Sequence, residues 1–263
     1  MLCIFVTLKA KIANLLRYFL ELSYNGKAYH GWQNQPNAIS VQEALEKALS
    51  TILKDNIEIV GAGRTDAGVH ASQMFAHFDF EGQFKSEDLT YKLNSFLPKD
   101  IAIHSVFKVL PEAHARFDAI SRTYHYRVST SKNVFDYDFA YQMHLPLNVE
   151  AMNEACKILF KYNDFQCFSK SNTDVKTYNC DIKEAFWTKN ENELLFTIKA
   201  NRFLRNMVRA VVGTMINIGL GKLKPEDLHQ IITSKDRGEA GFSVPAHGLY
   251  LVNIEYPETI KLN

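Results

Sequence analysis

The run GAGRTDAGVHA at residues 61–71 is the most unusual stretch of the chain. Three glycines fall within its first eight residues, which marks backbone that adopts a positive φ or approaches another group closely. One cation, Arg64, and one carboxylate, Asp66, stand between the glycines. Apolar residues precede the run and alternating apolar residues follow it at 74–80, so we expect it to connect two strands.

A loop held between two strands is a usual position for functional residues. In such a loop Asp66 could act as a nucleophile, as a general base or as a metal ligand. The alternative is a structural turn in which Asp66 caps its own backbone and Arg64 is simply solvated. The spacing of the two residues, taken alone, slightly favours the structural turn.

Around this loop the hydrophobic periodicity predicts a split βαβ unit. The predicted elements are a strand at 18–24, a helix at 41–54, strands at 57–60 and 74–80, a helix at 86–96 and a strand at 101–109. Ser40 and Glu43 form a capping box for the first helix, and Ser86 is the expected cap of the second. This order is the ferredoxin-like arrangement found in many RNA-binding modules.

The same order of elements begins again after residue 110. The predicted elements are a strand at 123–129, a helix at 149–160, strands at 179–188 and 194–200, helices at 203–218 and 225–233, and a strand at 249–255. We therefore expect an α+β fold with two ferredoxin-like halves, residues 17–110 and 111–263, related by a pseudo-twofold and fused through one mainly antiparallel sheet. Residues 1–16 lack a clean signal-peptide cleavage site and are interpreted as an N-terminal extension of uncertain order.

The composition is that of an ordinary globular protein, with 46% hydrophobic and 22% charged residues. The net charge of +1 argues against a uniformly basic coat for nucleic acid, although it leaves local basic patches open. The four cysteines form no C-x-x-C pair and indicate reduced thiols in a cytosolic protein. No apolar run reaches the length that spans a membrane.

Positive charge gathers in the predicted helix at 203–218 and next to it. The cations between residues 199 and 224, with no acidic residue among them, are Lys199, Arg202, Arg205, Arg209, Lys222 and Lys224. Helical spacing places the three arginines on one narrow face, and Gly213 leaves a bare spot there that another backbone could approach. A solvated face is the usual explanation for such arginines. Because they repel one another, an external anion such as a phosphate is favoured.

A second basic and aromatic cluster comprises Arg116-Phe117 and the run RTYHYR at 122–127. On a strand Tyr124 and Tyr126 share one face and Arg127 lies on the other. Tyrosines at this spacing suit half-buried positions in a sheet and base stacking above phosphates equally well.

A metal site could be built from Asp66, His70, His77 and Asp79, and His77 and Asp79 would share one strand face. The chain contains no H-E-x-x-H or C-x-x-C motif, and lone histidines are usually structural, so this site is not favoured. A phosphate cradle is not favoured either, because no Lys-Ser/Thr pair follows the glycines.

The sequence GRTDAGVHA at residues 63–71 resembles the signature of the tRNA pseudouridine synthase A (TruA) family, and the resemblance spans about residues 17–256. The other matching segments are YHGWQ at 29–33, SVQE at 40–43, HARF at 114–117, RTY at 122–124, FLRNMVRAVVG at 203–213 and GLYL at 248–251. The resemblance implies conversion of uridine to pseudouridine at positions 38, 39 and 40 of the tRNA anticodon stem-loop. It also implies that no metal or organic cofactor is needed, and that the protein is a homodimer in which each tRNA touches both subunits.

The resemblance assigns roles to individual residues. Asp66 matches the catalytic aspartate, Tyr124 the tyrosine that packs on the target base, and Arg209 the basic partner of the aspartate. The expected RNA contacts are Arg64, Arg122, Arg202 and Arg205. The target uridine must leave its stack before any side chain reaches the glycosidic bond. Attack by the carboxylate at C6, attack at C1′ and deprotonation of the sugar all remain open.

Two other hypotheses remain beside this one. The first is a tRNA-binding protein without catalytic activity, in which the two halves act as RNA-recognition modules. The second is a metal-dependent nuclease that uses Asp66 and His70.

Overall fold

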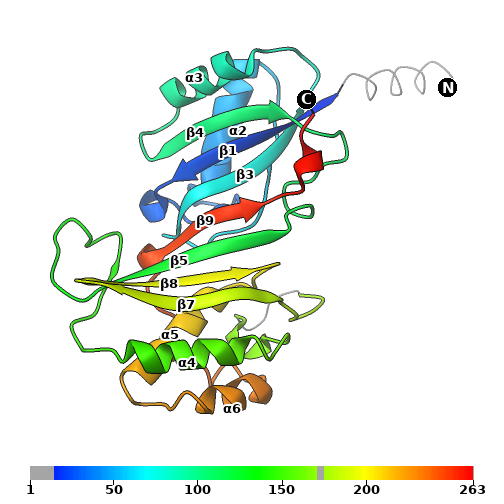
Figure 1. Cartoon of the computed structure of the whole chain (residues 1–263). Helices are drawn as coiled ribbons and strands as arrows, with labels where there is room; N and C mark the ends of the chain where they lie inside the picture. The colour runs from blue at the N-terminus through cyan, green and yellow to red at the C-terminus, as the bar shows by residue number, and fades with distance from the viewer. Residues whose placement is uncertain (1–14, 171–174, 263) are drawn as a thin grey trace.

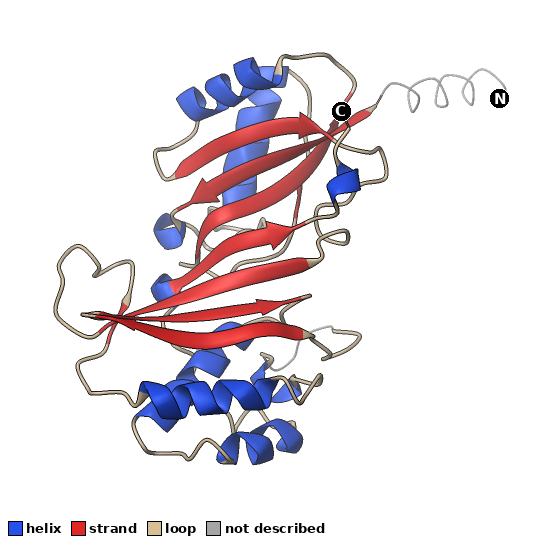
Figure 2. Cartoon of the chain, in the orientation of Figure 1, coloured by secondary structure: helices blue, strands red, loops and turns tan. Residues whose placement is uncertain are grey.

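The computed structural model describes residues 15–170 and 175–262. Within them the strands form one sheet in the order β4-β1-β3-β9-β5-β8-β7, while β2 pairs with β3 and β6 pairs with β5 (Figure 1). The sheet runs as a continuous band, with α2 and α3 beside its first half and α4, α5 and α6 beside its second (Figure 2). Residues 1–14 of the predicted N-terminal extension lie outside the described residues, and Leu16 is already the first residue of β1.

The first half has the predicted ferredoxin-like order. Its elements are β1 (Leu16–Tyr24), α2 (Val41–Leu53), β2 (Val60–Gly61), β3 (His70–Phe80), α3 (Ser86–Phe96) and β4 (Ile101–Lys108). The strands β4, β1, β3 and β2 lie side by side in that order, and each neighbouring pair is antiparallel. Ser40 caps α2 as predicted, since its Oγ accepts a hydrogen bond from the Glu43 amide. The cap of α3 is Lys85, and Ser86 is the first helical residue.

The second half repeats this order. Its elements are β5 (Ser121–Ser129), β6 (Tyr141–Gln142), α4 (Val149–Leu159), β7 (Ile182–Asn190), β8 (Glu193–Ala200), α5 (Met207–Gly219), α6 (Asp227–Ser234) and β9 (Leu249–Glu255). The strands lie in the order β9-β5-β8-β7, again antiparallel between neighbours. The predicted α+β class with two similar halves sharing one mainly antiparallel sheet is therefore confirmed.

The two halves join where β3 pairs with β9 in parallel, at His70 with Tyr250 and at Ala71 with Leu251. Because β2 is only two residues long, it leaves the start of β3 free to pair with β9. A twofold axis would pair a strand with its own counterpart in the other half. This junction instead pairs β3, the third strand of the first half, with β9, the fourth strand of the second half. The halves thus follow one another in the same direction along the sheet. The loop that carries Asp66 lies between β2 and β3, at this junction.

Each half buries its own apolar cluster. The first cluster includes Phe19 and Leu20 of β1, and the second includes Trp187 and Phe196 of β7 and β8. Each large apolar side chain that is fully buried contributes about 1.5–3 kcal/mol to folding. Tyr124 packs against both clusters, so the centre of β5 belongs to the region where the halves meet.

Helix α5 begins at Met207, four residues later than the periodicity predicts. Asn206 takes a left-handed conformation with φ of 68°, and its side-chain amide donates to Ser243 Oγ at 2.7 Å. Arg202 and Arg205 therefore precede the helix, and the prediction that they share one helix face with Arg209 is wrong. The apolar pattern of residues 203–206 continues that of the helix, which is why periodicity cannot locate this break.

Among the described residues no helix is long and apolar enough to cross a membrane. Cys156, Cys167 and Cys180 are buried, unpaired thiols, and burial raises the pKa of Cys180 to about 11. Cys3 lies outside the described residues.

Candidate active site

The loop that carries Asp66 is held by the segment that follows β1. The Trp32 amide donates to the Thr65 carbonyl at 3.2 Å, and the Gly68 amide donates to the Tyr29 carbonyl at 3.3 Å. Gly31 has a φ of 95°, and a Cβ at this position would lie only 2.4 Å from the Thr65 carbonyl oxygen. Only glycine allows this close approach. The motif at residues 29–33 thus fixes the loop from one side.

Two side chains fix the loop, one beside Asp66 and one at the start of β3. The Tyr24 hydroxyl and Thr65 Oγ1 share a hydrogen bond of 2.8 Å. His70 accepts a hydrogen bond from the Gly26 amide at its Nδ1 and stacks on the Tyr250 ring at 4.7 Å. Burial lowers the pKa of His70, so its imidazole is neutral at physiological pH. Sequence reasoning missed Tyr24 and Thr65 because nothing local in the sequence predicts their contact.

The residues considered for a metal site are engaged in separate contacts. His77 accepts a hydrogen bond from the Ala115 amide, and Asp79 forms an ion pair with Arg17 at 2.7 Å. Burial, and secondarily the charges of Arg17 and His114, lower the pKa of His77 to about 4. Within residues 15–170 and 175–262, no group of three or more His, Cys, Asp or Glu side chains is placed to hold a metal ion.

Two arginines face the Asp66 carboxylate. Arg209 Nη1 lies 3.5 Å from Oδ2, and Arg205 Nε lies 3.6 Å from Oδ1. Both distances exceed those of an N–H···O hydrogen bond, so the cations balance the carboxylate charge without occupying its lone pairs. The Asp66 side chain is 27% exposed. The oxygens therefore remain available to a substrate.

Arg209 is positioned from the opposite side by the segment that precedes β9. Its Nε donates to the Val244 carbonyl at 2.7 Å. The neighbouring Phe242 carbonyl oxygen lies 1.8 Å from the position that a Cβ on Gly213 would occupy. The backbone that approaches the bare spot at Gly213 therefore belongs to this chain. The contact holds the 241–244 segment against α5, and that segment fixes the Arg209 guanidinium.

Tyr124 lies on β5 beside this group. Its ring packs edge-on against Phe203 with 5.2 Å between centroids. Burial raises the pKa of Tyr124 to about 12; the Arg122 charge opposes this shift and the Asp66 charge adds to it. The hydroxyl is therefore protonated at neutral pH. The sequence did not predict that Phe203 contributes to the site, because the periodicity placed Phe203 in a regular helix.

Arg122 links three loops around the site. Its Nη1 donates to the carbonyls of Ala119 and Asn201 at 3.0 and 2.8 Å. Its Nη2 donates to the carbonyls of Ala62 and Arg116 at 3.1 and 2.5 Å. These four bonds connect the start of the Asp66 loop, the segment before β5 and the segment after β8. The structure thus makes Arg122 a brace between loops, and the RNA contact expected for it stays a prediction.

Of the other residues predicted to contact RNA, Arg64 and Arg205 lie at the site. Arg64 is exposed on the same loop as Asp66, and it makes no hydrogen bond or ion pair with any other described residue. Arg205 is 60% exposed beside Asp66, whereas Arg202 donates to the Thr177 carbonyl at 3.2 Å. The structure therefore brings Asp66, Tyr124, Arg205 and Arg209 together and holds Arg202 toward another loop.

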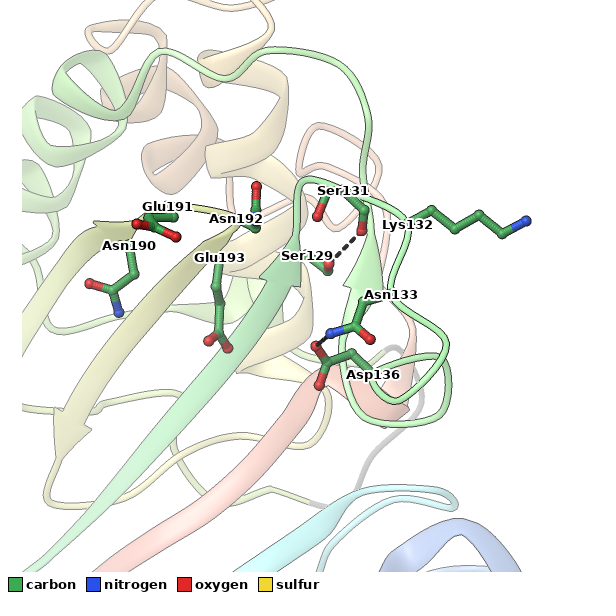
Figure 3. A pocket seen from close by; sticks show the side chains of 9 residues that line it. All are labelled: Ser129, Ser131, Lys132, Asn133, Asp136, Asn190, Glu191, Asn192 and Glu193. Carbon is green, nitrogen blue, oxygen red and sulfur yellow. Dashed lines mark hydrogen bonds between the residues drawn. The ribbon is translucent and has the colours of Figure 1, made fainter.

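An open hollow of about 570 Å³ lies away from this group (Figure 3). It is formed by the end of β5, the following loop and the turn between β7 and β8. Arg127 forms ion pairs with two carboxylates that line the hollow, Glu193 and Asp136. None of the predicted site residues lines it.

The family model described as tRNA pseudouridine synthase matches residues 22–118 and 155–257. The chain belongs to the tRNA pseudouridine synthase family. Asp66, Arg205 and Arg209 all lie within the segments that the family model matches. The family is one of isomerases, so the geometry around Asp66 is that of a candidate isomerase site.

Curated relatives of the chain carry the name "tRNA pseudouridine synthase A". The chain is 53% identical to the protein of Parabacteroides distasonis, over 93% of this chain and 97% of the relative. It is 54% identical to that of Bacteroides fragilis, over 93% and 98%. The identity to that of Bacillus subtilis is 40%, over 92% and 99%. The similarity therefore extends over nearly the whole of each relative.

Proposed function

We propose that this protein converts uridine to pseudouridine at positions 38, 39 and 40 in the anticodon stem-loop of tRNA, with Asp66 as the catalytic carboxylate. The observation that carries the proposal is the Asp66 carboxylate, which is reachable from solvent and faces Arg209 and Arg205 at 3.5 and 3.6 Å. The family membership of the chain and the names of its relatives support an enzyme over a tRNA-binding protein without catalytic activity.

The reaction breaks the C1′–N1 bond and joins C1′ to C5 of the same base. C5 loses its proton and N1 gains one, so the product is an isomer of the substrate. The target uridine first leaves its stack, because Asp66 cannot reach a stacked base. The ionised carboxylate then attacks C6 or C1′, or removes a proton from the sugar. Each route needs one carboxylate beside a base that is held while it rotates. Arg209 and Arg205 stabilise the charged carboxylate after water has been displaced.

Tyr124 covers the face of the detached base in this proposal. With a pKa of about 12 its hydroxyl is protonated at neutral pH, so it serves as a hydrogen-bond donor to the base. The hydroxyl can accept the C5 proton only if it gives up its own proton. The proposed acceptor of that proton is the Asp66 carboxylate, whose charge raises the pKa of Tyr124. Arg64 enters the space that the base vacates, and Arg205 and Arg202 contact phosphates.

We also propose that the protein acts in the cytoplasm as a homodimer and needs neither a metal nor an organic cofactor. The resemblance to the family supports the homodimer and the lack of a cofactor, and the cysteines without a C-x-x-C pair support the cytoplasm. Arg205 and Arg209 lie close enough to Asp66 to balance its charge. Light scattering after gel filtration tests the assembly: a homodimer doubles the 30.1 kDa mass of the chain.

Tritium release from C5-labelled uridine in tRNA, with EDTA present, tests the reaction. Wild-type protein is expected to release tritium, while Asp66→Asn releases none and still binds tRNA. Asp138→Asn serves as the matched control, because Asp138 is a carboxylate in an exposed ion pair with Lys27. Turnover by Asp66→Asn would disprove a nucleophilic or basic role for Asp66. Strand cleavage that EDTA abolishes would instead support the nuclease hypothesis.

A further inference from the structure

The loop at residues 113–118 presents an exposed aromatic ring beside a cation, close to the Asp66 loop. Phe117 is 73% exposed, and the Arg116 guanidinium carbon lies 5.7 Å from the centre of its ring. The imidazole of His114 lies against the same ring, with 4.3 Å between centroids. Covering such a ring with a ligand is favourable because apolar surface is removed from water.

This loop is anchored from several sides although its tip is exposed. Arg17 donates to the Ala113 carbonyl and His77 accepts from the Ala115 amide. The Tyr256 hydroxyl donates to the Ala115 carbonyl, and the His114 amide donates to a carboxylate oxygen of Asp118 at 2.7 Å. The backbone that carries Phe117 is therefore fixed, which lowers the entropy cost of binding a ligand.

The position of this loop relative to the site follows from Arg122. The same nitrogen, Nη2, donates to the carbonyl of Arg116 and to that of Ala62, at the start of the Asp66 loop. The tip with Phe117 and the loop with Asp66 thus share one hydrogen-bonding partner. The backbone at Arg116 therefore lies next to the start of the Asp66 loop.

We propose that Phe117 and Arg116 form an RNA subsite in which a second, unpaired nucleobase of the same tRNA stacks on Phe117 while Arg116 contacts its phosphate. This proposal rests on the proposed function. Aromatic stacking together with a neighbouring arginine is how proteins hold single-stranded nucleotides. A protein partner would need a contiguous apolar patch, whereas His114, Arg116 and Asp118 surround Phe117 with polar groups.

The experiment measures binding of the anticodon stem-loop to protein that already carries Asp66→Asn, so that no turnover is required. Phe117→Ala is expected to weaken the Kd by roughly 5- to 150-fold, the range that corresponds to one stacked base. Phe117→Trp is expected to restore most of the affinity. Tyr91→Ala is the matched control, because Tyr91 is 75% exposed on α3 and is expected to leave the Kd unchanged.

Salt dependence separates the two components of the subsite. Arg116→Gln is expected to reduce the magnitude of the negative slope of log K against log salt by about 0.7 to 0.9, the value for one phosphate contact. Phe117→Ala is expected to leave the slope unchanged, because stacking releases no counterion. If Phe117→Ala leaves the Kd unchanged, the subsite is refuted whatever the outcome of the tritium assay. If the same variant instead dissociates a homodimer, Phe117 belongs to a protein interface and the proposal is overturned.

Discussion

The hydrogen bonds of Arg122 make a sharp prediction about how the site is held together. In Arg122→Met all four carbonyls lose their charged donor. A hydrogen bond to a charged group contributes about 1.5–3 kcal/mol, but water can replace some of these donors, so we expect a total loss of about 4 kcal/mol in the free energy of unfolding. For a chain of this length that corresponds to a fall in Tm of roughly 10 °C.

Two comparison variants separate the fork geometry and the charge of Arg122 from general damage to β5. Arg122→Lys keeps the charge, but a single ammonium cannot reach carbonyls on three loops, so about half of the loss should remain. Arg127→Gln removes a cation of the same strand whose ion-pair partners, Glu193 and Asp136, line the hollow and whose guanidinium carbon also lies 6.0 Å from the centre of the Tyr250 ring. It should lower Tm without changing KM, whereas Arg122→Met should also raise KM.

Thermal unfolding and tritium-release kinetics measure both effects. A Tm within 2 °C of the wild-type value, together with an unchanged kcat/KM, would refute the brace. A different outcome would be an unchanged Tm together with weaker tRNA binding and a salt slope reduced in magnitude by one phosphate contact. That result would leave Arg122 with the role that the sequence predicts, a direct contact to RNA.

Three further predictions concern the site and its support. Gly213→Ala should displace the facing segment, because the main-chain oxygen there lies 1.8 Å from the new Cβ, and should reduce both Tm and kcat; Gly63→Ala, which meets nothing within 4 Å, should leave Tm unchanged. Replacing Arg202 and Arg205 by Gln should reduce the magnitude of the salt slope of tRNA binding by about 1.4 to 1.8, and an unchanged slope would indicate solvated side chains. Burial and adjoining positive charges lower the pKa of His77 to about 4. Between pH 6.5 and pH 4 the unfolded chain therefore binds a proton at His77 that the folded chain does not bind. The free energy of unfolding falls as the pH drops through this range. At pH 5 the loss is about 2 kcal/mol, and His77→Gln should reduce the difference in Tm between pH 7 and pH 5; an equal difference in both proteins would contradict this origin.

The sequence by itself determined most of the elements of the fold. Alternating apolar residues predict β3 and β9, and the Ser40 capping box predicts the start of α2, because these patterns depend on local periodicity and on hydrogen bonds between near neighbours. The repeated order of elements predicted two ferredoxin-like halves in one sheet, as observed. The glycine-rich run likewise singled out Asp66.

The tertiary structure alone decided which residues meet. The sequence contains no signal that α5 starts at Met207, because the left-handed turn at Asn206 depends on a contact with Ser243. It contains no signal that Arg205 faces Asp66, because the two residues lie in different halves of the chain and meet only in the folded protein. Local patterns determine which segments form strands and helices. The side-chain contacts that make up a site depend on packing between distant segments, which only the folded chain specifies.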